Sequence, residues 1–269
     1  MINRRFKANR PVQEKNTNIT PYWQVIEKII NESNIILEVL DARMPKISRN
    51  KELELMIKEK NKELIFILNK SDLVAEKELR KTLRNLQKEA QTFVVSSSKK
   101  IGTKRLRDFL LRKGKKVEWF KIGVVGYPNT GKSSVINTLI LRKKAIVTSK
   151  AGTTRGVQWI NLRDNIQIID SPGIIPIKQE DEIRYALIGS RNVERLINVE
   201  LVAHAIIKLF ENKNNLLEFY KTSCKSKDPE KIIEEIGKAK RFIKKKGEID
   251  EIRTSTQIIR DWQRGKLRL

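Results

Sequence analysis

The sequence predicts an α/β fold in which a mostly parallel, doubly wound sheet is followed by a small all-helical domain. Two observations support this prediction. Short apolar segments alternate with helix-length stretches over the first 170 residues, as in strands that are covered on both faces. After residue 173 the apolar residues recur at helical spacing. The predicted strands begin near Ile35, Leu64, Thr92, Trp119, Val157 and Ile166.

The N-terminal elements follow from local signals. Residues 1–18 are polar and basic without periodicity, which predicts a flexible arm. The first helix should begin at Thr20-Pro21, because proline favours the first helical turn. Residues 119–125 read as a buried strand that leads to a helix over residues 132–141. Residues 157–162 alternate in polarity, which suits an edge strand.

The C-terminal region should consist of helices only. One apolar stripe includes Val202, Ile206, Leu209 and Phe210. Asp228-Pro229 is typical of a helix start, and Gly265 of a helix end. We therefore expect an arm over residues 1–18, an α/β domain over residues 19–180 and a helical domain over residues 181–269.

The strongest motif lies between the fourth strand and its helix. It reads Gly126-Tyr127-Pro128-Asn129-Thr130-Gly131-Lys132-Ser133, the pattern G-x-x-x-x-G-K-S. In such a loop the backbone N–H groups surround phosphate oxygens, the lysine reaches the β- and γ-phosphates, and the serine hydroxyl ligates Mg²⁺. The predicted phosphate-binding residues are Asn129, Thr130, Gly131, Lys132, Ser133 and Ser134.

Two further segments predict base recognition. Asn69-Lys70-Ser71-Asp72 follows a buried strand, and Asp72 can accept the paired donors of guanine, which adenine lacks. Asn69 and the stem of Lys70 would frame the base. Ser97, Ser98 and Lys99 follow the next strand and are assigned to base contact, the alternative being an ordinary polar strand exit.

A third segment, Asp170-Ser171-Pro172-Gly173, follows the last strand. A carboxylate at a strand end can hold Mg²⁺ through water, and the N–H of Gly173 can sense a γ-phosphate. The expected ligands are therefore GTP or GDP with Mg²⁺. In ordinary GTPases the phosphate loop precedes the base-reading loop, whereas here Asn69 to Asp72 come first. The domain is predicted to be a circularly permuted P-loop GTPase domain.

In this order, the motifs resemble the circularly permuted GTPases of ribosome biogenesis, the YlqF/YawG (RbgA-like) branch of the large subunit. The resemblance covers nearly the whole chain and includes Asp41-Ala42-Arg43-Met44-Pro45, Gly152-Thr153-Thr154-Arg155, residues 246–250 and residues 260–267. It implies that the large ribosomal subunit and its rRNA are the partners. It also favours Thr154 over Thr153 as an Mg²⁺ ligand. The family's N-terminal histidine has no counterpart, because the only histidine is His204.

The catalytic residues are predicted to be Lys132, Thr154 and Gly173. Many GTPases orient the attacking water with a Gln directly after the last motif, but this chain has Ile174. A ribosomal group, a monovalent cation, or Thr154 with Mg²⁺ would have to orient the water instead. Asn129 resembles the asparagine that ligates K⁺ in potassium-dependent GTPases, the alternative being a plain turn residue.

Composition limits the possible partners. The 57 Lys and Arg exceed the 32 Asp and Glu, which gives a formal net charge of +25. This surplus favours a polyanion, with RNA ahead of a membrane, and we expect no DNA partner. No signal peptide or membrane span is evident. The single cysteine, Cys224, excludes an internal disulfide. Basic clusters over residues 112–116, 142–144 and 238–246 read as solvated faces, the alternative being binding sites. Trp262 reads as a core residue, the alternative being a residue that stacks on RNA.

These observations predict a cytoplasmic, monomeric GTPase that acts as a maturation factor of the large ribosomal subunit, with the helical domain over residues 181–269 binding rRNA. One alternative is a nucleotide-gated RNA-binding module with negligible turnover. Another is a signalling GTPase with a protein effector, which the net charge disfavours.

Overall fold

The computed structural model describes residues 20–140, 158–170, 181–245 and 247–269. Its sheet has six strands in the order β3-β2-β1-β4-β6-β5, and all neighbours are parallel except β5 and β6. The strands are β1 (Ile35–Asp41), β2 (Glu63–Asn69), β3 (Gln91–Val94), β4 (Phe120–Val125), β5 (Gln158–Arg163) and β6 (Ile166–Asp170). The predicted mostly parallel sheet is confirmed, and β5 is the edge strand that its alternating sequence predicted.

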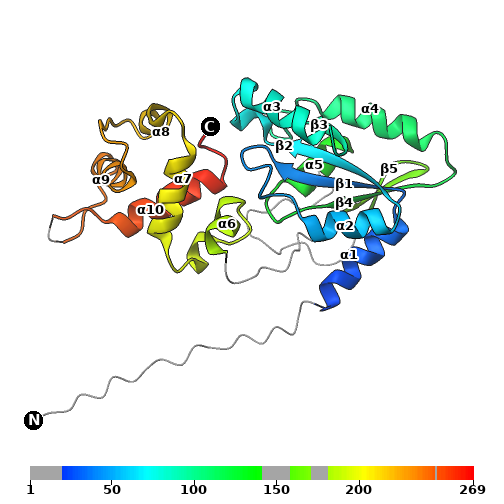
Figure 1. The fold of residues 1–269 in the computed structure, drawn as a ribbon, viewed down its shortest axis with the longest axis horizontal. Helices are drawn as coiled ribbons and strands as arrows, with labels where there is room; N and C mark the ends of the chain where they lie inside the picture. The colour runs from blue at the N-terminus through cyan, green and yellow to red at the C-terminus, as the bar shows by residue number, and fades with distance from the viewer. Residues whose placement is uncertain (1–19, 141–157, 171–180, 246) are drawn as a thin grey trace, which may run out of the picture.

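Helices cover both faces of the sheet. They are α1 (Thr20–Glu32), α2 (Lys51–Glu59), α3 (Glu76–Leu86), α4 (Thr103–Gly114) and α5 (Lys132–Leu139), with a 3-10 turn η1 (Ser71–Leu73). Residues of α1, α2 and α3 pack against one face, which carries Ile36, Leu40 and Phe66. Residues of α4 and α5 pack against the other, which carries Leu37 and Val39. Because neighbouring strand residues point to opposite faces, each strand is buried under helices on both sides, as in a doubly wound sheet (Figure 1).

One strand prediction is wrong at its first residue. Trp119 was expected to begin a buried strand, but β4 begins at Phe120 and Trp119 is 57% exposed. The buried apolar run is Phe120, Ile122, Val124 and Val125. Trp119 belongs instead to the turn that leaves α4, where no pleat directs its side chain into the core.

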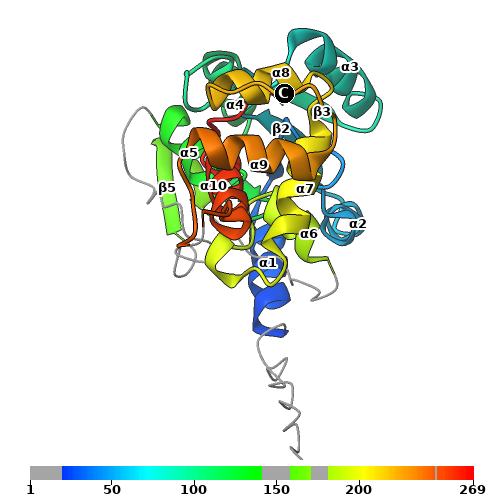
Figure 2. The same ribbon diagram turned by 90° about the vertical axis from the view of Figure 1, so that its left-hand side faces the viewer.

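The C-terminal helices form a core of their own. They are α6 (Glu182–Leu187), α7 (Val199–Leu209), α8 (Lys213–Phe219), α9 (Pro229–Ala239) and α10 (Glu251–Gln263), with a 3-10 turn η2 (Val193–Arg195). Figure 2 shows this group from the side that faces away from the sheet. Asp228 caps α9 by accepting the N–H of Glu230, with Pro229 in the first turn, as predicted. Gly265, with φ of +71°, follows the end of α10.

Trp262 is fully buried in the core of this helical group, which confirms the core interpretation and excludes stacking on an external base. Its indole Nε1 donates to the carbonyl of Leu187 at 2.7 Å. None of the helices in the described parts of the chain is long and apolar enough to cross a bilayer.

Candidate functional site

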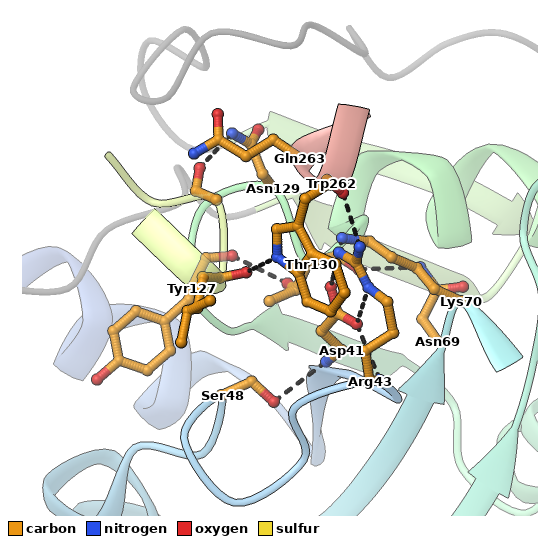
Figure 3. Close-up of polar contacts among 12 residues, drawn as sticks. Asp41, Arg43, Ser48, Asn69, Lys70, Tyr127, Asn129, Thr130, Trp262 and Gln263 are labelled. Atoms are coloured by element: carbon orange, nitrogen blue, oxygen red, sulfur yellow. Dashed lines mark hydrogen bonds and ion pairs between the residues drawn. The ribbon is translucent and has the colours of Figure 1, made fainter. Parts of the chain in front are cut away.

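The predicted motifs meet at one edge of the sheet, where β1, β2 and β4 end. In a parallel sheet the carboxyl ends of the strands lie together, so loops far apart in sequence become neighbours. Asn69 is the last residue of β2, and the glycine-rich loop 126–133 follows β4 directly. Residues 96–99 follow β3 at the same edge. Figure 3 shows the polar contacts around Asp41, Asn69 and Thr130 at this edge.

The Asn69 side chain connects its own motif to the glycine-rich loop and to the segment after β3. Its side-chain Nδ2 donates to the carbonyl of Thr130 at 2.9 Å. Its Oδ1 accepts the backbone N–H of Ser97 at 3.1 Å. The residue is 1% exposed, so both bonds are shielded from water. A single buried amide therefore fixes the glycine-rich loop relative to both predicted base-recognition loops.

The glycine-rich loop requires glycine beside Asn69. Gly131 has φ of +99°, and an added Cβ would collide with the Asn69 amide. The Lys132 side chain is buried, and its Nζ donates to the carbonyls of Gly126 and Tyr127, both at 2.9 Å. Lys132 also begins α5, so the amino end of that helix is directed to the space that the loop encloses. Ser133 and Ser134, in the same first turn, are half-buried.

The guanine-reading candidate Asp72 is surrounded by serines. Ser96 Oγ donates to Asp72 Oδ1 at 2.5 Å, and Ser98 Oγ lies 3.3 Å from Oδ2. Ser96 was not among the predicted residues, although it is fully buried and also accepts the backbone N–H of Lys99 at 3.1 Å. Its position directly after a strand end was the only signal available. The structure places Ser97, Ser98 and Lys99 beside Asn69, Asp72 and Ser96, and their assignment to base contact stays a prediction.

Lys70 connects the site to a buried carboxylate. The residue has φ of +62°, and its Nζ donates to Asp41 Oδ2 at 2.6 Å. Arg43 holds the same carboxylate with two bonds, Nε to Oδ1 at 3.1 Å and a terminal nitrogen to Oδ2 at 2.8 Å. Burial alone would raise the pKa of Asp41, but the charges of Arg43 and Lys70 outweigh it and hold this pKa far below its usual value. Asp41 is therefore a fully buried, ionised anchor.

Arg43 extends this network to the helical group. A terminal guanidinium nitrogen donates to the carbonyl of Trp262 at 2.7 Å, and the guanidinium carbon lies 3.9 Å from the indole centroid. Sequence reasoning singled out Asp41 and Arg43 only as part of a family signature. A polar pair at the end of a buried strand was a signal of a structural role, but nothing in the sequence indicated that Trp262 was its partner.

Further contacts link the site to the helical group, among them the packing of Tyr127 in the glycine-rich loop against Tyr185. Asn129 of the glycine-rich loop donates through Nδ2 to the carbonyl of Gly189 at 2.5 Å. The C-terminal Leu269 exchanges backbone hydrogen bonds with the segment after Asp72, donating to Leu73 at 2.9 Å and accepting from Ala75 at 3.1 Å. The helical group therefore contacts both the phosphate-side loop and the base-side loop.

The predicted site residues Thr154 and Gly173 lie outside the described part of the chain. The alternative ligand Thr153 and the residue Ile174 also lie outside it. Asp170 ends β6, and its backbone pairs in register with Val124 near the end of β4. That register brings this strand end to the same edge as the glycine-rich loop.

Two family models match the sequence. The family described as "RsgA GTPase" matches residues 12–179, more than half of the chain. The family described as "50S ribosome-binding GTPase" matches residues 121–241.

Curated relatives are also similar over most of this chain. An uncharacterized GTP-binding protein of Methanocaldococcus jannaschii is 38% identical over 251 residues, which span 92% of this chain and 66% of the relative. The nucleolar GTP-binding protein 2 of Saccharomyces cerevisiae is 35% identical over 254 residues, which span 91% of this chain and 52% of that protein. The chain thus spans only part of the relatives it matches.

The fold matches two solved structures of YlqF. The GNP-bound form from T. maritima aligns with a TM-score of 0.62 and 24% identity, over 91% of this chain and 94% of that chain. The GDP-bound form aligns with a TM-score of 0.60 and 25% identity, over 90% and 94% of the two chains. Because the Asn69-Lys70-Ser71-Asp72 motif after β2 precedes the glycine-rich loop after β4, and because the RsgA GTPase model spans more than half of the sequence, the chain belongs to the circularly permuted GTPases and shares the fold of YlqF.

Proposed function

We propose that this protein binds GTP and GDP at the edge of the sheet described above, with Asp72 reading the guanine. The observation that carries the proposal is the Asn69 amide, which bonds to both Thr130 and Ser97. Phosphate-binding and base-binding loops that share one buried residue fit the two ends of a single nucleotide. Lys132, Ser133 and the other residues of the loop would contact the phosphates and Mg²⁺.

We further propose that the protein hydrolyses GTP with the help of Lys132, Thr154 and Gly173, and that Ser133, Thr154 and Asp170 hold the Mg²⁺. A K⁺ ion at Asn129 would offset charge that develops on the leaving oxygen. Support for weak intrinsic turnover comes from Ile174, which has no polar atom to orient water.

The proposed cellular role is nucleotide-gated maturation of the large ribosomal subunit through rRNA. The support is the net charge of +25, together with relatives whose names place them in the nucleolus. The contacts of Arg43 and Asn129 with the helical group give nucleotide binding a physical route to that group. The relatives extend beyond the aligned region, so this role is proposed only for the segment that they share.

GTP turnover measured with immature large subunits, mature large subunits, small subunits and no RNA tests the proposal. The expected result is stimulation by large subunits, and tighter subunit binding with a non-hydrolysable GTP analogue than with GDP. Equal binding in both nucleotide states, with no stimulation, would contradict it.

The second candidate is an RNA-binding module gated by nucleotide with negligible turnover. Ile174, in place of a water-orienting Gln, favours it. In the same assay it predicts nucleotide-dependent subunit binding without any stimulated hydrolysis.

A further inference from the structure

The turn between α4 and β4 presents an exposed aromatic surface among basic residues. Trp119 is 57% exposed and Val117 is 40% exposed. Residues 112–121 contain five Lys or Arg and a single acidic residue, Glu118. A tryptophan is usually mostly buried, because it offers one of the largest apolar surfaces of any side chain. Its exposure within a basic segment therefore points to a partner that is both anionic and aromatic.

The turn is held in a defined conformation. The Asn165 side chain donates to the carbonyls of Gly114 and Val117, at 3.0 and 3.1 Å. The carbonyl of Asn165 accepts the backbone N–H of Phe120 at 2.8 Å. Gly114 is buried, and an added Cβ there would collide with Ile166 of β6. Trp119 thus lies in a turn whose backbone is fixed by hydrogen bonds and by packing. This lowers the conformational entropy lost when a partner binds.

The charges around Trp119 favour an anion. Lys113 is bound to Glu63 at 2.7 Å. Within the described part of the chain, Lys115 and Lys116 form no ion pair, and both are exposed. The nearby acidic groups of the turn and of the β5–β6 connection are Glu118 and Asp164. The basic groups of this surface therefore exceed the acidic ones.

The position of this surface separates it from the nucleotide site. It lies where β4 begins, whereas the glycine-rich loop lies where β4 ends. Six strand residues between them correspond to about 20 Å. Figure 1 shows the connection from α4 to β4 on the far side of the sheet from helices α6 to α10.

We propose that this surface, formed by Arg112, Lys115, Lys116, Val117 and Trp119, binds an unpaired segment of RNA. Trp119 would stack on one exposed base, while Lys115 and Lys116 contact the neighbouring phosphates. Duplex RNA offers no free base to Trp119, because the faces of its bases are covered by stacking on each other. The inference rests on the proposed role in ribosome maturation, and it adds a second RNA contact that is remote from the helical group.

The experiment uses the full chain and a single-stranded oligouridylate of about 15 nucleotides, with a fully paired RNA hairpin for comparison. Intrinsic fluorescence reports on stacking, since a base on Trp119 quenches its emission. We expect quenching by the oligouridylate in the wild type and its loss in Trp119→Phe, which keeps an aromatic face. Trp119→Ala should weaken oligouridylate binding at least about fivefold, whereas Trp119→Phe should retain most of the affinity.

The lysines are tested by the salt dependence of binding. Lys115→Ala with Lys116→Ala should lower the slope of log affinity against log salt by about 1.4, because each phosphate contact to a single strand contributes about 0.7. A matched control is Lys77→Ala with Lys81→Ala on α3, which removes the same charge from another exposed surface. GDP affinity should stay unchanged in all of these variants.

Three results would overturn the inference: quenching that persists in Trp119→Phe, equal binding by Trp119→Ala and the wild type, or the same effect from both lysine pairs. None of these readouts uses GTP turnover or ribosomal subunits, so a failure here is distinct from a failure of the proposed function.

Discussion

Replacing Arg43 by Met tests the buried network beneath the predicted guanine loop. Arg43 makes two bonds to the fully buried Asp41 carboxylate and one to the carbonyl of Trp262. Removing one partner of a buried ion pair costs about 3–5 kcal/mol, because the remaining charge is left uncompensated. The Trp262 carbonyl would also lose its hydrogen-bond donor, which adds to the cost. The two costs are not simply additive, because both arise from the same side chain. Lys70, at 2.6 Å from Asp41, offsets part of the loss. We therefore expect a free energy of unfolding lower by about 3–4 kcal/mol.

The measurement is urea unfolding of the full chain, followed by circular dichroism and by tryptophan fluorescence. The matched control is Arg80→Met, which removes an exposed arginine paired with Glu76 on α3 and should change the unfolding free energy by less than about 1 kcal/mol. Equal shifts of the urea midpoint in the two variants would refute the buried network.

The network also predicts that the free energy of unfolding depends on pH in the acid range. The pKa of Asp41 is lowered in the folded chain from its ordinary value of 3.8. The stabilisation is therefore complete above that pH and is lost as the pH falls below it, because protonation removes the charge that Arg43 and Lys70 neutralise. Since Arg43→Met retains only Lys70 as a partner, its stability difference from the wild type should shrink in strong acid.

Four further outcomes are expected. Asp72→Asn should shift nucleotide preference from guanine toward xanthine, because the donor and acceptor at that edge are exchanged; competition binding with GDP and XDP measures this, and an unchanged preference would contradict the assignment. Lys132→Ala and Ser133→Ala should each abolish GTP turnover by removing a phosphate contact and a Mg²⁺ ligand, which single-turnover assays would detect. Replacing Na⁺ by K⁺ at constant ionic strength should raise turnover, and Asn129→Ala should remove the difference; equal rates in both salts would exclude potassium. Burial raises the pKa of Glu38 from 4.5 to about 8, so between these values only the unfolded chain has lost the proton and stability should fall as pH rises. Glu38→Gln should remove that decline, up to about 1.4 kcal/mol per pH unit, as measured by urea unfolding at pH 5 and 8.

Much of the sheet could be predicted from sequence because its strands are buried on both faces and read as apolar runs. Ile35 and Ile166 begin strands where their runs predicted. Trp119 was misplaced because an aromatic residue before such a run is indistinguishable from its first member. Only the turn held by Asn165, contributed by a distant connection, excludes it.

The grouping of the site loops was predictable because parallel strands end at one edge. The contacts between those loops were not. Asn69 was expected to frame a base, but in the structure its amide also bonds to Thr130 and Ser97. The network from Asp41 through Arg43 to Trp262 joins positions separated by more than 200 residues, and no local pattern encodes such a distance.

The contacts between the site and the helical group reach both ends of the site. Beneath the predicted guanine loop, Arg43 donates a hydrogen bond to the carbonyl of Trp262 and stacks on its indole. A hydrogen bond from a charged donor is worth about 1.5–3 kcal/mol, and separating Trp262 from Arg43 would leave the ion pair with Asp41 in place.

On the phosphate side, the Asn129 amide donates to the carbonyl of Gly189, and Tyr127 of the glycine-rich loop packs against Tyr185 of α6. Because loops at both ends of the site contact the helical group, a nucleotide that shifts either loop acts on that group through direct contacts. We therefore expect the helical group to move together with the site loops rather than to detach from the sheet.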